Sequence, residues 1–248
     1  MHETPSRLHT WRNVVPKLVD RFAMYAFDLL RFGSSERRDG LNVSVSAQAS
    51  LLAELVEFWG LEALVVAGHD IGGGMVLRAH LLGGIEFSRI SLIDAVVLRP
   101  WITPTTRHVK ANLDVYGTMP TGSFEAFVVG HLRTTSYHPI DEQAFAVYME
   151  QWRGEIGQKS YLQKDAQLDE GRTAEFEPLP RLMRTPVRIL WGERDAWLNP
   201  SAARRLEDMP PNAELEFIPD AGHSCMEDAP ERVADSLTSF FTRAKDIM

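Results

Sequence analysis

Short apolar runs alternate with helical periodicities along most of the chain. In four segments, apolar residues recur every three to four positions, which predicts amphipathic helices. These segments are Leu51–Trp59, Met75–Leu82, Ser201–Asp208 and Pro230–Arg243. Five short apolar runs predict buried strands at Phe22–Asp28, Ala63–Ala67, Ile90–Ala95, Pro186–Trp191 and Ala213–Ile218. The alternation predicts an α/β fold with a mostly parallel sheet that helices cover on both faces.

A glycine-rich turn stands between one predicted strand and one predicted helix. Residues 68–73 read Gly-His-Asp-Ile-Gly-Gly. A strand that enters a helix through such a turn projects its middle residue on a strained backbone, and the usual form of this elbow is G-x-S-x-G. Here the elbow residue is Asp70. Because a carboxylate can act as a covalent nucleophile, the turn predicts attack on saturated carbon and an aspartyl-ester intermediate.

Two later loops carry an acid and a histidine, each just past the end of a predicted strand. Asp195 follows the run that ends at Trp191, and His223 follows the run that ends at Ile218. Open α/β sheets place their sites at this edge, and the order nucleophile, acid, histidine is that of α/β-hydrolases. From residue 2 to residue 243 the chain resembles the α/β-hydrolase family. More narrowly, it is similar to the aspartate-nucleophile branch of epoxide hydrolases and dehalogenases.

The resemblance implies an α/β-hydrolase fold in two parts. We expect residues 1–99 and 173–248 to form the core domain, a mostly parallel sheet flanked by helices. Residues 100–172 break the rhythm of strands and helices and carry many aromatic residues. In the family this is the place of a helical cap that closes over the nucleophile. We therefore expect a cap insertion here, with most of its aromatic side chains forming the cap's own core.

The resemblance also implies a role for each member of a catalytic triad. Asp70 would attack the substrate carbon and form the ester. His223 would then deprotonate the water that hydrolyses the ester, while Asp195 orients the imidazole and stabilises its charged form.

Hydrolysis of an ester passes through an oxyanion that needs backbone N–H donors. The residue after the nucleophile, Ile71, would supply one. The family's other donor comes from a His-Gly-x-Pro turn, which residues 2–5 (His-Glu-Thr-Pro) resemble. This assigns the second N–H to Thr4. Glu3 replaces the glycine of the motif, and its carboxylate would be unfavourable if it pointed at the developing anion.

The leaving group separates the two enzymatic alternatives. An epoxide oxygen needs a proton donor, which cap tyrosines supply in the family; Tyr161 lies near the expected position, with Tyr116 or Tyr137 as its counterpart. A halide needs N–H donors, and many haloalkane dehalogenases carry Trp after the nucleophile, where this chain has Ile71. Epoxide hydrolysis is therefore our first expectation, and dehalogenation is the alternative. A third alternative is a non-catalytic protein with the hydrolase fold.

Composition limits the partners and the compartment. The chain has 248 residues and a net charge of −8, which argues against a nucleic-acid partner. Cys225 is the single cysteine, so no internal disulfide can form, and no apolar run approaches the roughly 20 residues of a membrane span. The histidines show no metal-ligand spacing, and we expect neither metal nor cofactor. We expect a cytoplasmic enzyme acting on a small hydrophobic organic substrate with water; a homodimer is compatible with the sequence.

The front of the sheet is an open question in this sequence. In the family, the His-Gly-x-Pro turn follows the third strand, whereas the matching turn here begins at His2. That third strand lies between the strands that correspond here to Phe22–Asp28 and Ala63–Ala67. Its absence would leave unpaired backbone groups in the middle of the sheet. We therefore expect the native product to carry further residues before Met1, and the 248-residue chain to be low-melting and nearly inactive.

Overall fold

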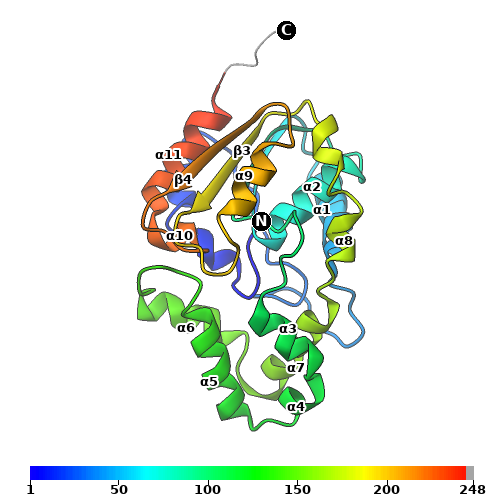
Figure 1. The fold of residues 1–248 in the computed structure, drawn as a ribbon, viewed down its shortest axis with the longest axis vertical. Helices are drawn as coiled ribbons and strands as arrows, with labels where there is room; N and C mark the ends of the chain where they lie inside the picture. Colours follow the sequence, from blue (N-terminus) through cyan, green and yellow to red (C-terminus); the bar gives the residue numbers. More distant parts are fainter. Residues whose placement is uncertain (244–248) are drawn as a thin grey trace.

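The computed structural model describes residues 1–243. Within this range four strands form one parallel sheet in the order β1-β2-β3-β4; β3 and β4 are labelled in Figure 1. The strands are β1 Leu64–His69, β2 Phe87–Ile93, β3 Val187–Gly192 and β4 Ala213–Ile218. Four of the five predicted strands are thus confirmed, and so is the expected α/β-hydrolase architecture of a parallel sheet between helices.

Helices pack on both faces of the sheet, so β2 and β3 are almost wholly buried, whereas β4 at the edge is only partly buried. Successive side chains of a strand point to opposite faces, so on β2 Leu92 joins one apolar core and Ile93 joins another. The first core packs the sheet against α1 (Val45–Phe58), α2 (Ile71–Leu81) and α9 (Ser201–Glu207). The second core packs it against α11 (Pro230–Phe241) and the 3₁₀ helices η1 (Leu8–Trp11) and η2 (Val15–Lys17).

A layer made of helices alone lies below the sheet in Figure 1. It contains α3 (Pro104–Ala111), α4 (Leu113–Gly117), α5 (Thr121–Leu132), α6 (Glu142–Glu150) and α7 (Gly154–Gln167). The chain returns to β3 through α8 (Gly171–Ala174) and η3 (Leu179–Leu182), and α10 (Cys225–Asp228) precedes α11. Within residues 1–243, no helix is both long and apolar enough to cross a bilayer. The helical layer coincides with the expected cap, and its status as a separate domain stays a prediction.

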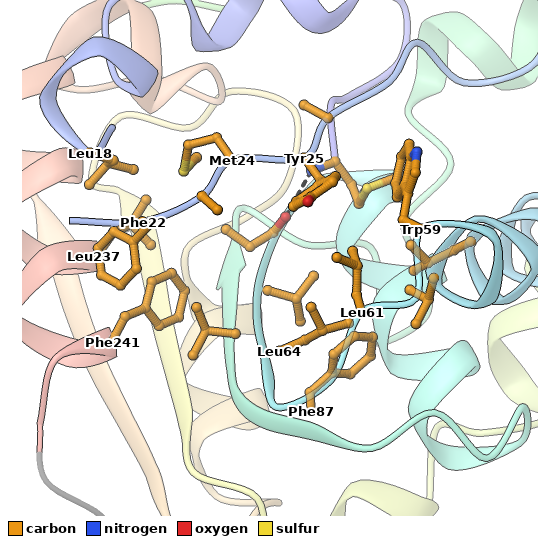
Figure 2. Close-up of a pocket in the computed structure, with 18 of the residues that line it drawn as sticks. Leu18, Phe22, Met24, Tyr25, Trp59, Leu61, Leu64, Phe87, Leu237 and Phe241 are labelled. Atoms are coloured by element: carbon orange, nitrogen blue, oxygen red, sulfur yellow. Dashed lines mark hydrogen bonds between the residues drawn. The ribbon is translucent and has the colours of Figure 1, made fainter. Parts of the chain in front are cut away.

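The fifth predicted strand is wrong. Residues 22–28 adopt no regular secondary structure. Most of this segment lines an apolar groove of about 410 Å³, and residues 64–67 of β1 line the same groove (Figure 2). Because a strand exists only through hydrogen bonds to a partner, a segment held across a groove from β1 cannot become one, whatever its apolar content. Met24 and Tyr25 consequently remain 40% and 51% exposed.

The amino terminus contacts the edge of β1 that borders this groove. The ammonium group of Met1 donates to the carbonyl oxygen of Ala67 at 2.8 Å, and the N–H of His69 donates to the carbonyl oxygen of Met1 at 3.1 Å. This is the bonding pattern of a parallel pair, and it sets Met1 opposite Gly68. Burial lowers the pKa of the Met1 ammonium group to about 5, because the surroundings disfavour its charge.

Candidate active site

The turn between β1 and α2 holds Asp70 in a strained backbone conformation. Its φ is 51° and its ψ is −121°, a region that residues other than glycine rarely adopt. The flanking glycines have no room for side chains. A Cβ on Gly68 would lie 2.5 Å from the carbonyl oxygen of Gly72, and a Cβ on Gly72 would lie 2.7 Å from the Cβ of Met1 and 2.9 Å from the carbonyl oxygen of His2. The turn therefore requires glycine on both sides, and it projects Asp70 from the carboxyl end of β1.

The two carboxylate oxygens of Asp70 have different surroundings. Oδ2 accepts a hydrogen bond from the backbone N–H of Thr4 at 3.0 Å, whereas Oδ1 lies 3.7 Å from Nε2 of His223. Burial raises the pKa of Asp70; His223 and backbone hydrogen bonds from Thr4 and Ile71 oppose this rise. Both residues predicted for the oxyanion hole thus contact the carboxylate of Asp70. Their role in catalysis stays a prediction.

His223 is oriented by Asp195, as the order of the motifs predicts. Nδ1 of His223 lies 3.0 Å from Oδ2 of Asp195, and because a carboxylate only accepts, Nδ1 carries the proton. Oδ1 of Asp195 accepts hydrogen bonds from the N–H groups of Trp197 and Leu198 at 2.7 and 2.9 Å. Nε2 of His223 faces Asp70 and has no hydrogen-bond partner within residues 1–243. It is therefore the nitrogen available to a water molecule.

Glu3 points into this site rather than away from it. It is 2% exposed, and both of its carboxylate oxygens accept from the hydroxyl of Ser224, at 2.9 and 3.0 Å. Oε2 lies 3.7 Å from Nε2 of His223. Burial raises the pKa of Glu3 to about 7; His223 opposes the rise and Asp70 adds to it. The carboxylate of Glu3 therefore has the inward orientation, which is unfavourable for an anion that develops at Asp70.

Three carboxylates surround the imidazole of His223. Burial lowers the pKa of His223, but Asp195, Asp70 and Glu3 outweigh burial and raise it to about 10. In the free site His223 is accordingly an imidazolium at neutral pH, and it must lose its Nε2 proton before it can act as a base.

Comparisons with known proteins identify the family of the chain. A model of the alpha/beta hydrolase family matches residues 7–236. The chain belongs to the alpha/beta hydrolase family. The solved structure of an alpha/beta hydrolase fold protein from Burkholderia ambifaria is 31% identical, covers 96% of this chain and 88% of its own, and has a TM-score of 0.93. Haloalkane dehalogenase 2 from Mycobacterium tuberculosis is 26% identical, with 97% of this chain and 86% of the relative covered.

An epoxide hydrolase, CorEH, shares the fold of this hydrolase. Its TM-score is 0.75 at 22% identity, with 97% of this chain and 89% of that chain covered. The proteins that resemble this chain thus include both a haloalkane dehalogenase and an epoxide hydrolase. The chain is a hydrolase of the α/β fold, and its reaction has to be argued from the site.

Within residues 1–243, two groups of side chains have the residue types of a metal site. They are Glu3, His69 and His223, and Asp94, Asp195 and His223. In the first group, Nε2 of His69 lies 2.8 Å from the backbone carbonyl oxygen of His223, to which it donates, so it has no lone pair for a metal. In the second, the Nδ1 proton of His223 is shared with Asp195. Both arrangements fit a hydrogen-bonded triad better than a metal centre.

Tyr161 of α7 is buried in the helical layer, 1% exposed. Burial raises the pKa of Tyr161, and interactions with Asp165 and Tyr116 add to the rise. Tyr116 is therefore the neighbour of Tyr161, whereas Tyr137 is 50% exposed. Of the two proposed counterparts, the structure brings only Tyr116 close to Tyr161. The role of Tyr161 as proton donor stays a prediction.

Sequence reasoning missed a stack of rings on His223. The indole of Trp197 stacks on His223 with ring centroids 5.2 Å apart, and His131 of α5 stacks on Trp197 at 4.4 Å. Trp197 could have been found, because it lies two residues after Asp195. His131 comes from the helical layer, and no local pattern connects it to the triad. Asp94, just past β2, was also missed; its Oδ1 accepts the last N–H of β3 at 2.8 Å and so braces the Asp195 loop.

Proposed function

We propose that this hydrolase opens an epoxide through a covalent ester on Asp70. The observation that carries the proposal is the difference between the two oxygens of Asp70. Oδ2 is held by the N–H of Thr4, and Oδ1 faces Nε2 of His223. Oδ1 is therefore the oxygen that can attack, and Oδ2 becomes the carbonyl oxygen of the ester. The N–H that holds Oδ2 then faces the oxyanion of the second step.

In the first step, Oδ1 of Asp70 bonds to a ring carbon while the ring carbon–oxygen bond breaks. The ring oxygen takes a proton from a donor, for which Tyr161 is the candidate. In the second step, water adds to the carboxyl carbon and gives one proton to His223. The alcohol then leaves with that proton, and the product is a diol. The second water proton leaves the restored carboxyl group and replaces the one that Tyr161 gave.

The available donors favour an epoxide over a carbon–halogen bond. A departing halide needs N–H donors, and Ile71 after the nucleophile has none in its side chain. The indole N–H groups of four tryptophans already donate to protein acceptors; these are Trp101, Trp152, Trp191 and Trp197. A phenol such as that of Tyr161 offers the proton that an epoxide requires. Dehalogenation remains the alternative because a mycobacterial relative is named a haloalkane dehalogenase.

The groups of the proposed cap near His223 support a small, apolar and uncharged substrate. Burial lowers the pKa of His131 to about 3, so its imidazole is neutral. Lys164 is buried with Asp165 at 2.5 Å between Nζ and Oδ1, and this ion pair neutralises its charge. The aromatic rings of His131 and Trp197 therefore border the site without adding a charge of their own.

A single turnover in heavy-oxygen water tests the proposal. Because the second step returns one water oxygen to the carboxylate, the first label should appear on Asp70, and intact-chain mass should show the ester before that. Asp70→Ala should abolish turnover, and His223→Ala should let the adduct accumulate. His138→Ala, in an exposed loop, is the matched control and should behave as wild type. Label that goes straight to product with Asp70 unlabelled would mean direct attack by water, and the proposal would be wrong.

A further inference from the structure

Glu3 is enclosed by polar groups from several parts of the fold. The groups that interact with its carboxylate are His69, Asp70, Tyr148, His223 and the hydroxyls of Ser6 and Ser224. His69 is neutral, since burial lowers the pKa of its imidazole well below the usual value. Tyr148 donates its hydroxyl proton to Glu227, and burial raises its pKa. Among these neighbours, only His223 carries a positive charge at neutral pH.

The charge of Glu3 acts on the two proposed steps differently. In the second step Nε2 of His223 must be free of its proton, and a carboxylate 3.7 Å away stabilises the protonated form. The same step builds negative charge on Oδ2 of Asp70, which a neighbouring carboxylate repels. Both effects oppose hydrolysis of the ester. Neither opposes the first step, in which Asp70 loses its own negative charge.

We propose that Glu3 is a positioning residue that slows hydrolysis of the Asp70 ester, so that the site holds its substrate covalently at neutral and mildly alkaline pH. This rests on the proposed aspartyl ester. Ionised Glu3 keeps the proton on Nε2 of His223, and the ester persists until that proton leaves. Hydrolysis therefore accelerates as the pH rises, and the enzyme forms its ester faster than it releases the product.

The sign of the pH effect follows from the charges around His223. In the free site its pKa is raised to about 10 by three carboxylates that outweigh burial. Ester formation removes the charge of Asp70 and lowers the pKa, but the charge of Glu3 remains. Replacing Glu3 by an amide lowers the pKa further. At a fixed pH below the pKa of His223, lowering that pKa by one unit raises the neutral fraction of His223 about tenfold. The Glu3→Gln variant should therefore hydrolyse the ester faster at the same pH.

The test compares wild type with Glu3→Gln in single turnovers with an epoxide at pH 7, 8 and 9. Intact-chain mass follows the ester. Ester formation should be similar in both proteins, whereas hydrolysis at pH 8 should be about tenfold faster in Glu3→Gln. The acid limb of kcat should move to lower pH, and the pKa of His223 measured by NMR should fall. Glu216→Gln on β4 removes a carboxylate that binds Arg188 of β3, and this control should change neither rate.

Ser224→Ala is a second variant that keeps the carboxylate. The hydroxyl of Ser224 lowers the pKa of Glu3, so its loss should keep Glu3 protonated to higher pH. Hydrolysis should then be faster than in wild type near pH 7 to 8 and equal to it well above, with no further gain when Glu3→Gln is added. Equal hydrolysis rates and equal acid limbs in wild type and Glu3→Gln would overturn this role of Glu3 alone. Absence of any ester on Asp70 would overturn the proposed function as well.

Discussion

The two edges of β1 differ in what they contact. One edge pairs with β2 in parallel, from Leu64 opposite Phe87 to His69 opposite Ile93. Within residues 1–243, the other edge bonds to Met1 near its carboxyl end and then borders the apolar groove of Figure 2. The paired edge continues through β2 to β3 and β4, whose following loops carry Asp195 and His223.

This difference separates chemistry from stability. The triad is built where paired strands end, so its distances depend on the sheet and on short turns. The groove exposes apolar side chains, and the burial of such surface stabilises a fold without touching a reacting atom. We therefore expect changes at the site to alter rates, and changes at the groove to alter the free energy of unfolding. Three variants test this division, from the largest expected effect to the smallest.

Tyr161→Phe should slow ester formation and leave hydrolysis of a preformed ester nearly unchanged. A general acid typically contributes about 10²–10⁴-fold, and less where a second donor such as Tyr116 shares the task. Rapid quenching and intact-chain mass measure the two steps separately. Tyr25→Phe, a tyrosine that lines the groove, is the matched control and should leave both rates unchanged. Full activity in Tyr161→Phe would remove this residue from the site, and halide release from a haloalkane would favour the alternative activity.

The sequence predicted the part of the fold that is fixed by local pattern. The last strand, Ala213–Ile218, has the predicted bounds, and β3 differs from its prediction by one residue at each end. β3 lies inside the sheet, where both faces are covered and apolar content identifies it. In β4, at the edge, apolar residues alternate with Glu214 and Glu216, which is the pattern of a partly buried strand. Residues 22–28 are more apolar than β4 and nevertheless form no strand. The difference lies in the partner across the groove, which a single-sequence pattern does not contain.

The candidate site was predictable to a similar extent. The order of the motifs identified Asp70, Asp195 and His223 as candidates, because each follows the carboxyl end of a strand. The inward orientation of Glu3 depends on Ser224, which lies at the other end of the chain. The stack of His131 on Trp197 depends on how the helical layer docks. Both are tertiary contacts between distant segments, and neither leaves a trace in local spacing.

Gly68→Ala should destabilise the elbow and weaken activity together. Its Cβ would lie 2.5 Å from the carbonyl oxygen of Gly72, so β1 and α2 must move apart, at a cost of about 1–3 kcal/mol. Chemical denaturation and the rate of ester formation measure the two effects. Gly130→Ala in α5 has open space around its Cβ and should instead be neutral or stabilising by up to about 1 kcal/mol. Equal stability of the two variants would show that the elbow tolerates a side chain.

Adding a strand to the free edge of β1 should raise the melting temperature and change the chemistry least. Met1 already makes the bonds of a parallel pair, and a peptide N–H at its nitrogen would keep the bond to Ala67. A fusion of about six alternating Val and Thr residues before Met1 can extend this pairing into the groove. A net gain of about 1–2 kcal/mol would raise the melting temperature by roughly 2–8 °C.

The matched control for the added strand has proline at every second position, since proline has no N–H to donate to β1. It should melt like the 248-residue chain. If the Val/Thr fusion alone melts higher and gains activity, the edge of β1 that borders the groove limits stability. If both fusions melt like the parent, and the parent is already stable and fully active, the edge needs no partner. The expectation that the 248-residue chain is low-melting would then be wrong, and the division between site and edge would lose its basis.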